Sequence, residues 1–382
     1  MIYLDHAAAT PVDRRVAKAM SPYFSEQFFN PSAAYLAAVR TRQALDEARH
    51  KLASVIGARP AEIIMTAGAT ESDNLAINGV DGTVVTLNTE HPAVLDVVRS
   101  RGGKILPVDH SGMVNLEQLR KAIDDNVELV SVCYVNSETG IVADLGAIAA
   151  VIASIRSDRR SRGVRRQLLL HTDASQAAGL CDLNVARLGV DLMTLNAAKC
   201  YGPKQVGLLY IRGGIVLKPL LRGGGQEHGL RAGTENVASA VGFAVALALA
   251  EHLRKSETKR LGKLRNSIVK YLRSEIPGVQ ITENQKHQSP AIINFAVAGL
   301  DGERAVFALD ERGIMVSTGS ACAANKGTRS HVLLAMGLTP ELVDGSLRLS
   351  LGRLFTEDSL PELKAILAPT LKEQLRFGGL SD

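Results

Sequence analysis

The stretch that decides the fold is Asp191–Tyr210, DLMTLNAAKCYGPKQVGLLY. Two apolar runs flank a loop of small residues and glycine, which predicts two strands joined by a tight connection. Lys199 follows the first of these strands. A lysine in that place either meets a ligand at the edge of a sheet or is a solvated loop residue, and the stretch by itself leaves both interpretations open.

A second apolar run, Gln167–Gln176 (QLLLHTDASQ), predicts a neighbouring strand that ends on Asp173. Pyridoxal phosphate chemistry needs a lysine that forms a Schiff base and a carboxylate that keeps the pyridine nitrogen protonated, so that the ring accepts electrons. Lys199 and Asp173 are residues of these two types. The two strands therefore predict a site of this kind where they end.

Strands and helices alternate along the first two thirds of the chain, which predicts an α/β fold with a mostly parallel sheet. Ligands of such sheets lie beyond the C-terminal ends of the strands. The predicted strands are Glu62–Thr66, Thr83–Asn88, Lys104–Val108, Val127–Val135, Leu168–Thr172 and Asp191–Leu195. The predicted helices are Pro31–Gly57, Thr70–Gly79, His91–Arg101, Asn115–Ile123, Gly146–Arg156 and one that ends near Lys255.

After Lys255 the pattern changes and predicts a smaller α+β domain, joined by the N-terminal segment. We therefore expect one domain over residues 12–255 and a second over residues 1–11 and 256–382. The strands expected in the second are Ala291–Val297, Ile314–Ser317 and Ser346–Ser350, and the helices are Gly302–Arg312, His331–Met336 and Ser359–Leu375.

The composition is that of a soluble globular protein, with 46% hydrophobic and 22% charged residues and a net charge of +5. The arginine-dense run Arg156–Arg166 is either a solvated helix end or a surface for RNA or an acidic partner. The four cysteines form no C-x-x-C pair, which argues against a metal site and favours a reducing compartment. We expect a cytoplasmic protein without a signal peptide, in which the apolar run Val237–Ala250 is a buried helix too short to span a membrane.

Three segments carry groups suited to a charged, aromatic cofactor. In Gly68–Ser72 (GATES), backbone amides and the Thr70 hydroxyl would bind a phosphate, unless Thr70 only caps a helix. His91 begins a predicted helix after a strand, where it would stack on a ring and transfer protons or serve a structural role. The Asp173–Gln176 turn would bond a ring nitrogen and a phenolic oxygen, or only cap a turn.

Cys322 lies in a small, polar loop, STGSACAANKGTR, where Lys326 and Arg329 favour its thiolate form. Because this loop is more polar than the strand around Cys133, we predict a reactive role for Cys322. Arg348 alternates with apolar residues on a predicted strand, and we expect it half-buried and paired with a carboxylate, which is either a structural acid or the α-carboxylate of a substrate.

The segments together resemble the cysteine desulfurases of the NifS/IscS type, over nearly the whole chain. The motifs that carry the resemblance are GATESDNLAI, TEHPAVLD, VNSETG, HTDASQ, the lysine followed by YGPK, GGGQE with GTEN, GSAC and SLRLSLGR. The resemblance implies a class-V aminotransferase of fold type I, a homodimer whose large domain holds a mostly parallel seven-stranded sheet. It also implies pyridoxal phosphate as cofactor and conversion of L-cysteine to L-alanine, with the sulfur left as an enzyme persulfide.

The resemblance further implies a site. For the cofactor ring its residues would be Lys199 for the Schiff base, Asp173 on the pyridine nitrogen, Gln176 on the phenolic oxygen, and His91 on the ring and in proton transfer. The phosphate would be held by Ala69, Thr70, Asn196 and Ala198, together with Thr234 of the partner subunit. Asn136 would lie beside cofactor and substrate, Arg348 would bind the substrate carboxylate, and Cys322 would be the nucleophile. The persulfide would pass to an acceptor protein for iron–sulfur cluster assembly or tRNA thiolation, with no membrane and no direct nucleic-acid contact.

The chain departs from the family immediately before the lysine. Many members carry serine-x-histidine there, whereas this chain has Asn196-Ala197-Ala198. Two alternatives to a cysteine desulfurase therefore stay open. One is a related pyridoxal phosphate lyase, for example one that acts on selenocysteine, and the other is a sulfur-relay or scaffold protein that has lost catalysis.

Overall fold

The computed structural model of the chain describes residues 1–319 and 329–378. Its centre is a seven-stranded sheet with the order β2-β8-β7-β6-β5-β3-β4. β8 runs antiparallel to both neighbours, while the other pairs in this sheet are parallel. The prediction of a mostly parallel seven-stranded sheet is confirmed. The strands are β2 (Ile63–Thr66), β3 (Thr83–Leu87), β4 (Lys104–Leu106), β5 (Val127–Ser131), β6 (Leu169–Asp173), β7 (Leu192–Asn196) and β8 (Gly207–Ile211).

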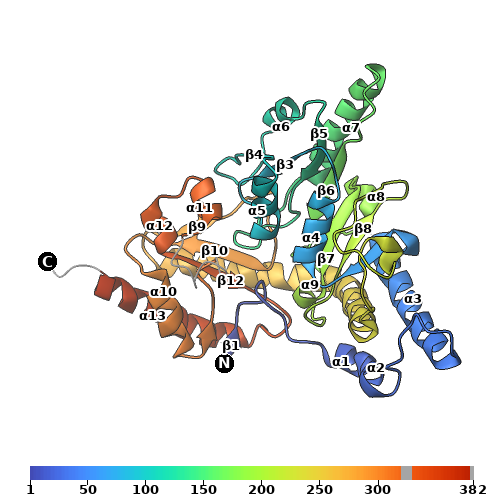
Figure 1. Cartoon of the computed structure of the whole chain (residues 1–382). Helices are drawn as coiled ribbons and strands as arrows, with labels where there is room; N and C mark the ends of the chain where they lie inside the picture. The colour runs from blue at the N-terminus through green and yellow to red at the C-terminus, as the bar shows by residue number, and fades with distance from the viewer. Residues whose placement is uncertain (320–328, 379–382) are drawn as a thin grey trace.

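Helices cover both faces of this sheet (Figure 1). α4 (Ala69–Asn78) and α5 (Pro92–Ser100) pack on one face, and α3 (Leu36–Ile56), α7 (Leu145–Ser161) and the first half of α9 (Val237–Glu275) pack on the other. Central strands such as β5 are thus buried along their whole length, which explains their continuous apolar runs. The remaining helices of this part are α1 (Arg14–Met20), α2 (Pro22–Ser25), α6 (Leu116–Ala122) and α8 (Val185–Leu188).

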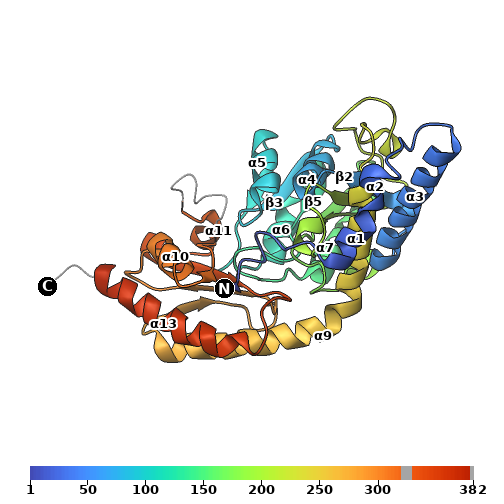
Figure 2. The same ribbon diagram turned by 90° about the horizontal axis from the view of Figure 1, so that it is seen from below.

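α9 has 39 residues and runs on to Glu275, so the predicted helix end near Lys255 is wrong. Its first half contributes Phe243 and Leu247 to the core around the large sheet. Its second half contributes a separate apolar stripe, including Leu264 and Leu272, to the core of the C-terminal part. Figure 2 shows the helix passing from the large sheet to the C-terminal part, where it lies beside α13 (Ser359–Gly378). The predicted domain boundary falls inside this helix and stays a prediction.

The same helix is apolar and long enough, by length and composition, to cross a membrane. More than half of its most apolar window is buried within the protein, as in a core helix. The run Val237–Ala250 is the beginning of this longer helix, in which Val237, Phe243 and Ala250 are buried.

The C-terminal part contains an antiparallel sheet of β12 (Ser346–Ser350), β10 (Ile292–Ala296) and β9 (Gln280–Thr282). A short N-terminal strand, β1 (Ile2–Tyr3), pairs with β11 (Ile314–Met315) beside it. Ile2 and Leu4 belong to its core, so the two ends of the chain fold together. Its helices, besides α13, are α10 (Gly302–Asp310), α11 (His331–Ala335) and α12 (Pro340–Asp344).

Two predicted elements are shorter than expected by four residues or more, each for a local reason. The helix predicted from Pro31 begins at Leu36, because Asn30 accepts a hydrogen bond from the backbone amide of Ser32 and forms a turn. The strand predicted as Val127–Val135 ends at Ser131. Beyond it, the Cys133 amide donates to the carboxyl group of Glu90 instead of to a neighbouring strand.

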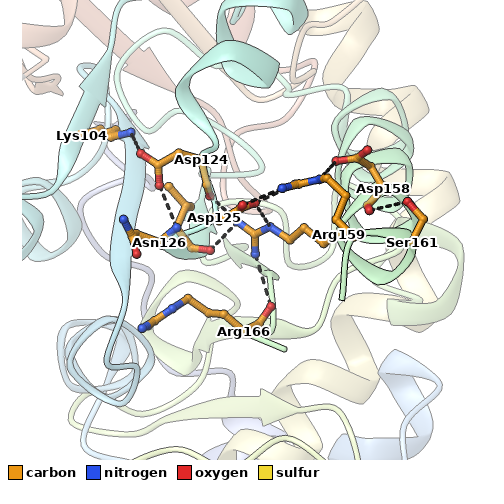
Figure 3. A network of polar contacts seen from close by, with 10 residues as sticks. Lys104, Asp124, Asp125, Asn126, Asp158, Arg159, Ser161 and Arg166 are labelled. Atoms are coloured by element: carbon orange, nitrogen blue, oxygen red, sulfur yellow. Dashed lines mark hydrogen bonds and ion pairs between the residues drawn. The ribbon is translucent and has the colours of Figure 1, made fainter. Parts of the chain in front are cut away.

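The arginine run folds back on the protein (Figure 3). Arg159 is buried, and its guanidinium donates to the carbonyl oxygens of Asp124 at 2.5 Å and Val127 at 2.8 Å. Its neighbours pair with acids of the same protein, Arg156 with Asp191, Arg162 with Asp125 and Arg166 with Glu128. Much of the positive charge in the run is therefore used inside the fold, where it joins α7 to the loop before β5.

Candidate active site

The predicted residues meet at one edge of the large sheet. Asp173 ends β6 and pairs in register with Thr194 on the adjacent β7. Asn196 ends β7 and is opposite Gly207, which is in turn opposite Thr66 at the end of β2. The chain segments that follow β2, β6 and β7 therefore begin side by side.

Close packing at this edge requires a glycine. A Cβ atom on Gly207 would lie 2.8 Å from the carbonyl carbon of Gly68 and 2.8 Å from the carbonyl oxygen of Leu195. Gly68 itself has a φ angle of 146°, a backbone conformation that residues other than glycine rarely adopt. The loop before α4 can thus approach the start of β8, opposite the end of β7, because Gly207 has no side chain, while glycine at position 68 permits the backbone conformation of the loop.

Lys199 lies in a 3₁₀ turn, Ala197–Lys199, directly after β7. Its side chain is half-buried, and Nζ donates hydrogen bonds to the carbonyl oxygens of Ala7 at 2.9 Å and Ala8 at 2.6 Å. The turn is held by Thr10, whose hydroxyl donates to the Ala198 carbonyl at 2.9 Å and accepts from the Tyr201 amide at 2.8 Å. Lys199 is therefore a positioned lysine and not a solvated loop residue.

The Asp173–Gln176 turn shares this N-terminal contact. Asp173 is half-buried, and its Oδ1 accepts from the Ser175 amide at 2.9 Å. Nε2 of Gln176 donates to the Ala7 carbonyl at 2.9 Å, the same oxygen that Lys199 contacts. The segment around Ala7 thus links the two strand ends that the sequence singles out.

A buried polar cluster beneath Asp173 was missed by sequence reasoning. His171 and Asp73 are both fully buried, with His171 Nε2 at 3.7 Å from Asp73 Oδ1 and 3.0 Å from the Thr194 hydroxyl. Burial, the main cause, lowers the pKa of His171 to about 4. Burial and the neighbouring Asp173 raise the pKa of Asp73 well above its ordinary value. The signal in the sequence was the spacing of His171 and Asp173, which places both side chains on one face of β6.

His91 caps α5, and its Nδ1 accepts a hydrogen bond from the Ala93 amide at 3.1 Å. Loss of solvent around the ring, the main cause, and the positive charge of Lys199 lower the pKa of His91, while Asp173 raises it. The ring is therefore neutral at pH 7, and with Nδ1 as acceptor its proton lies on Nε2. These mutual electrostatic effects show that His91, Asp173 and Lys199 lie in one neighbourhood.

The first turn of α4 begins at Ala69, and Gly68 provides no side-chain cap for its amides. Thr70 is exposed at this end. The glycine-rich loop reaches the same place, because Arg231 Nε donates to Glu71 Oε1 at 2.8 Å. Thr234, on this loop, is exposed. Uncapped amides at a helix start, next to a lysine and an aspartate, form a setting suited to a phosphate group.

Asn196 and Ala198 have a local role beside this setting. The Asn196 side-chain oxygen accepts from the Ala198 amide at 3.0 Å and closes the turn that carries Lys199. The predicted contacts of both residues with a phosphate stay a prediction.

Arg348 is buried on β12, more deeply than the half-buried position we expected. Of the two partners that the sequence left open, the structure contains the structural acid: Nη2 donates to Oδ1 of Asp5 at 2.6 Å. Nη1 donates to the carbonyl oxygens of Ser137 and Gly319 at 3.1 and 3.0 Å. Asn136 is buried next to Ser137, and its Nδ2 donates to the Thr89 carbonyl at 3.0 Å.

Cys322 lies outside the described residues. The chain on either side of that segment is anchored near Asn136, because the Gly319 carbonyl accepts from Arg348 and the Ser330 hydroxyl donates to Glu138 at 2.5 Å. At the described cysteines, burial disfavours the reactive thiolate form. It raises the pKa of Cys133 well above its ordinary value, the pKa of Cys181 to about 11 and the pKa of Cys200 to about 12. Among these described residues, no group of three His, Cys, Asp or Glu side chains could hold a metal ion.

The sequence and the fold are those of a known family. Residues 2–363 match the family Aminotransferase class-V, and the chain belongs to it. It is 39% identical, over 94% of its length and 91% of the relative, to a protein of Dictyoglomus turgidum named cysteine desulfurase IscS.

Solved structures show the same likeness. A NifS-like protein superposes with a TM-score of 0.87 at 32% identity, covering 97% of this chain and 99% of the other. A structure described as SspA in complex with cysteine has a TM-score of 0.77 at 32% identity, covering 92% of this chain and 99% of that one.

Proposed function

We propose that this protein is a pyridoxal phosphate-dependent cysteine desulfurase, which converts L-cysteine to L-alanine and transfers the sulfur to Cys322 as a persulfide. The observation that carries the proposal is the meeting of Lys199, Asp173 and the uncapped start of α4 at one sheet edge. Relatives named cysteine desulfurase, and a related structure described with cysteine, support the substrate.

The described residues fit pyridoxal phosphate. The amides of Ala69 and Thr70 would hold its phosphate, Asp173 its ring nitrogen and Lys199 its aldehyde carbon, with His91 against the ring. Bound there, the cofactor would withdraw electrons from the α-carbon of the substrate. Asn196 and Ala198 stand where the family has its serine and histidine, and the Asn196 side-chain oxygen accepts from the Ala198 amide. The phosphate would therefore rest mainly on backbone amides and, from the partner subunit, Thr234.

The chain's own residues supply the remaining steps. Arg348 would bind the substrate α-carboxylate, with Asn136 beside it, and Lys199 would remove and return the α-proton. The Cys322 thiolate would attack the substrate sulfur, so that an S–S bond forms while the C–S bond breaks. The electrons of the broken bond stay with carbon, which takes up a proton to give L-alanine. The sum is one enzyme thiol and L-cysteine converted to one enzyme persulfide and L-alanine.

The assembly that we propose is a homodimer. Four large apolar side chains between α2 and the start of α3 are each more than half exposed, which is typical of an interface. They are Phe24, Phe28, Tyr35 and Leu36. The glycine-rich loop with Thr234 is joined to α3 by the buried ion pair between Arg49 and Glu227 at 2.7 Å. The protein that we propose is soluble and cytoplasmic, and it passes sulfur to an acceptor for iron–sulfur cluster assembly or tRNA thiolation.

Two variants test it. Cys322→Ala, loaded with cofactor, is expected to lose sulfide formation from L-cysteine while its cofactor absorbance is retained; sulfide formation at the full rate would contradict the nucleophile. Lys199→Ala is expected to lose the cofactor linkage that borohydride reduces, which mass spectrometry reports. Alanine release from L-cysteine compared with L-selenocysteine separates a desulfurase from a selenocysteine lyase, and purified protein that takes up no cofactor would favour a non-catalytic relay.

A further inference from the structure

Arg348 is held from two directions. Its Nη1 donates to the carbonyl oxygens of Ser137 and Gly319, and its Nη2 donates to the Asp5 carboxylate at 2.6 Å. The side chain of Arg348 is only 4% exposed, and its Nε has no hydrogen-bond partner among the described residues. A buried N–H group without an acceptor costs free energy, so this edge of the guanidinium is the one prepared for a ligand.

Asp5 is itself fixed to the strand that carries Arg348. The backbone of Asp5 bridges to Ser350, two residues beyond Arg348 on β12. On either side, the Ser350 amide donates to the Leu4 carbonyl at 2.7 Å, and the His6 amide donates to the Ser350 carbonyl at 3.3 Å. The carboxylate is therefore a rigid partner, in contrast to a surface acid on a mobile side chain.

We propose that Asp5 is a positioning residue for substrate binding: by holding Nη2, its carboxylate orients the plane of the Arg348 guanidinium so that the unpaired Nε edge receives the substrate α-carboxylate. The inference rests on the proposed function, which assigns that carboxylate to Arg348. Bidentate recognition of a carboxylate depends on the orientation of the guanidinium plane, so a partner that fixes the plane strengthens binding without touching the substrate.

The same N-terminal segment contacts both Arg348 and Lys199. Asp5 contacts Arg348, and two and three residues further on the carbonyl groups of Ala7 and Ala8 accept from Lys199. One short segment thus joins the residue assigned to the carboxylate and the residue assigned to the α-proton. This arrangement is what a site for an α-amino acid needs, because its carboxylate and α-carbon are separated by a single bond.

A competing role for Asp5, in which its carboxylate blocks the substrate, would change KM in the opposite direction. If the carboxylate of Asp5 occupied the place of the substrate carboxylate, the two would compete, and removing the charge of Asp5 would lower the KM for L-cysteine. If Asp5 orients Arg348, removing the charge raises KM and leaves kcat nearly unchanged, because the chemical step does not involve Asp5.

The test compares Asp5→Asn with wild type as cofactor-loaded enzymes. We expect KM for L-cysteine to rise about tenfold with kcat within about twofold. Asp13→Asn is the matched control, since Asp13 lies on the same N-terminal segment and pairs with other arginines, Arg15 at 2.7 Å and Arg353 at 3.5 Å; it is expected to keep the wild-type KM. An unchanged or lower KM in Asp5→Asn overturns the proposal.

A second readout separates positioning from a general structural role. Inhibition by L-alanine, which has the carboxylate, is expected to weaken in Asp5→Asn by the same factor as KM rises. Inhibition by ethylamine, which lacks the carboxylate, is expected to stay unchanged, and an equal loss for both compounds contradicts the inference. If Asp5→Asn does not fold, Asp5→Glu replaces it, because it keeps the charge but moves it by one methylene group and should raise KM by a smaller factor.

Arg348→Lys keeps the two hypotheses apart. A lysine cannot present a planar fork, so the proposed function expects KM to rise in this variant. No change in Arg348→Lys would contradict the assignment of the carboxylate to Arg348. A rise in Arg348→Lys without a rise in Asp5→Asn would contradict the role of Asp5 alone.

Discussion

Nζ of Lys199 lies 2.6 Å from the carbonyl oxygen of Ala8, although the two residues are separated by 191 positions in the chain. The N-terminal segment is therefore part of the wall that holds the lysine. Thr10 strengthens this contact from the other side, because its hydroxyl bonds both the Ala198 carbonyl and the Tyr201 amide.

Thr10→Val is expected to destabilise the protein. The substitution keeps the shape but leaves the part-buried Tyr201 amide without its acceptor, while the Ala198 carbonyl keeps only the hydrogen bond from the Thr10 amide at 3.0 Å. We expect this to cost roughly 1–3 kcal/mol of unfolding free energy. Urea unfolding measures this loss. Thr356→Val is the control, because Thr356 is exposed and its hydroxyl contacts only Ser359 among the described residues. Equal stabilities of the two variants would contradict the role of Thr10.

Gly207→Ala is expected to displace the loop before α4. The new Cβ would lie 2.8 Å from backbone atoms of Gly68 and Leu195, so the backbone must shift at a cost of roughly 1–3 kcal/mol. Since this loop leads to the amides proposed for the phosphate, cofactor affinity measured by absorbance titration is expected to fall. Gly262→Ala in α9, where the nearest atom is 3.9 Å from the new Cβ, is expected to be neutral or stabilising.

Glu90 should make stability depend on pH. It is fully buried, and burial, the main cause, raises its pKa to about 8 from an ordinary value of 4.5. The folded protein keeps this proton between those pH values while the unfolded chain loses it, so the contribution of Glu90 to stability falls as pH rises. Glu90→Gln removes this effect. Between pH 4.5 and pH 8, the free energy of unfolding of the variant should therefore rise by on the order of 4 kcal/mol relative to that of wild type.

Chemical unfolding at a series of pH values measures this difference for Glu90→Gln. The exposed Glu117 on α6 provides the control, and Glu117→Gln is expected to follow the wild-type pH dependence. A Glu90→Gln protein whose stability runs parallel to that of wild type over this range would show that Glu90 is ionised in the folded state.

Arg159→Met is expected to be strongly destabilising, whereas Arg160→Met is not. Arg159 is buried and donates to the carbonyl groups of Asp124 and Val127, so its loss removes both hydrogen bonds and leaves the Asp124 carbonyl with only the Val127 amide as donor. We expect this to cost roughly 2–4 kcal/mol. Arg160, the next residue, is exposed, and its replacement should change stability by less than about 0.5 kcal/mol. Thermal unfolding of the two variants decides whether the run acts inside the fold.

Local patterns were sufficient for much of the fold. Continuous apolar runs marked the buried parallel strands, and Asp173 and Lys199 were found because each follows such a run. The end of α9 was not found, since a helix that changes from wholly apolar to amphipathic shows its continuation only when the second core is known. The strand after Val127 was overextended because the acceptor for the Cys133 amide, Glu90, comes from another part of the chain.

The sequence by itself determined the class of fold, the residues that end its central strands and the family to which the chain belongs, because these depend on periodicity and on short motifs. Only the tertiary structure decided which groups share a site. Asp5 and Arg348 are 343 residues apart, and the Asp73 and His171 pair joins a helix to a strand. Such contacts depend on how the two ends of the chain fold together around β12 and on how α4 covers the sheet, and neither can be read from local sequence.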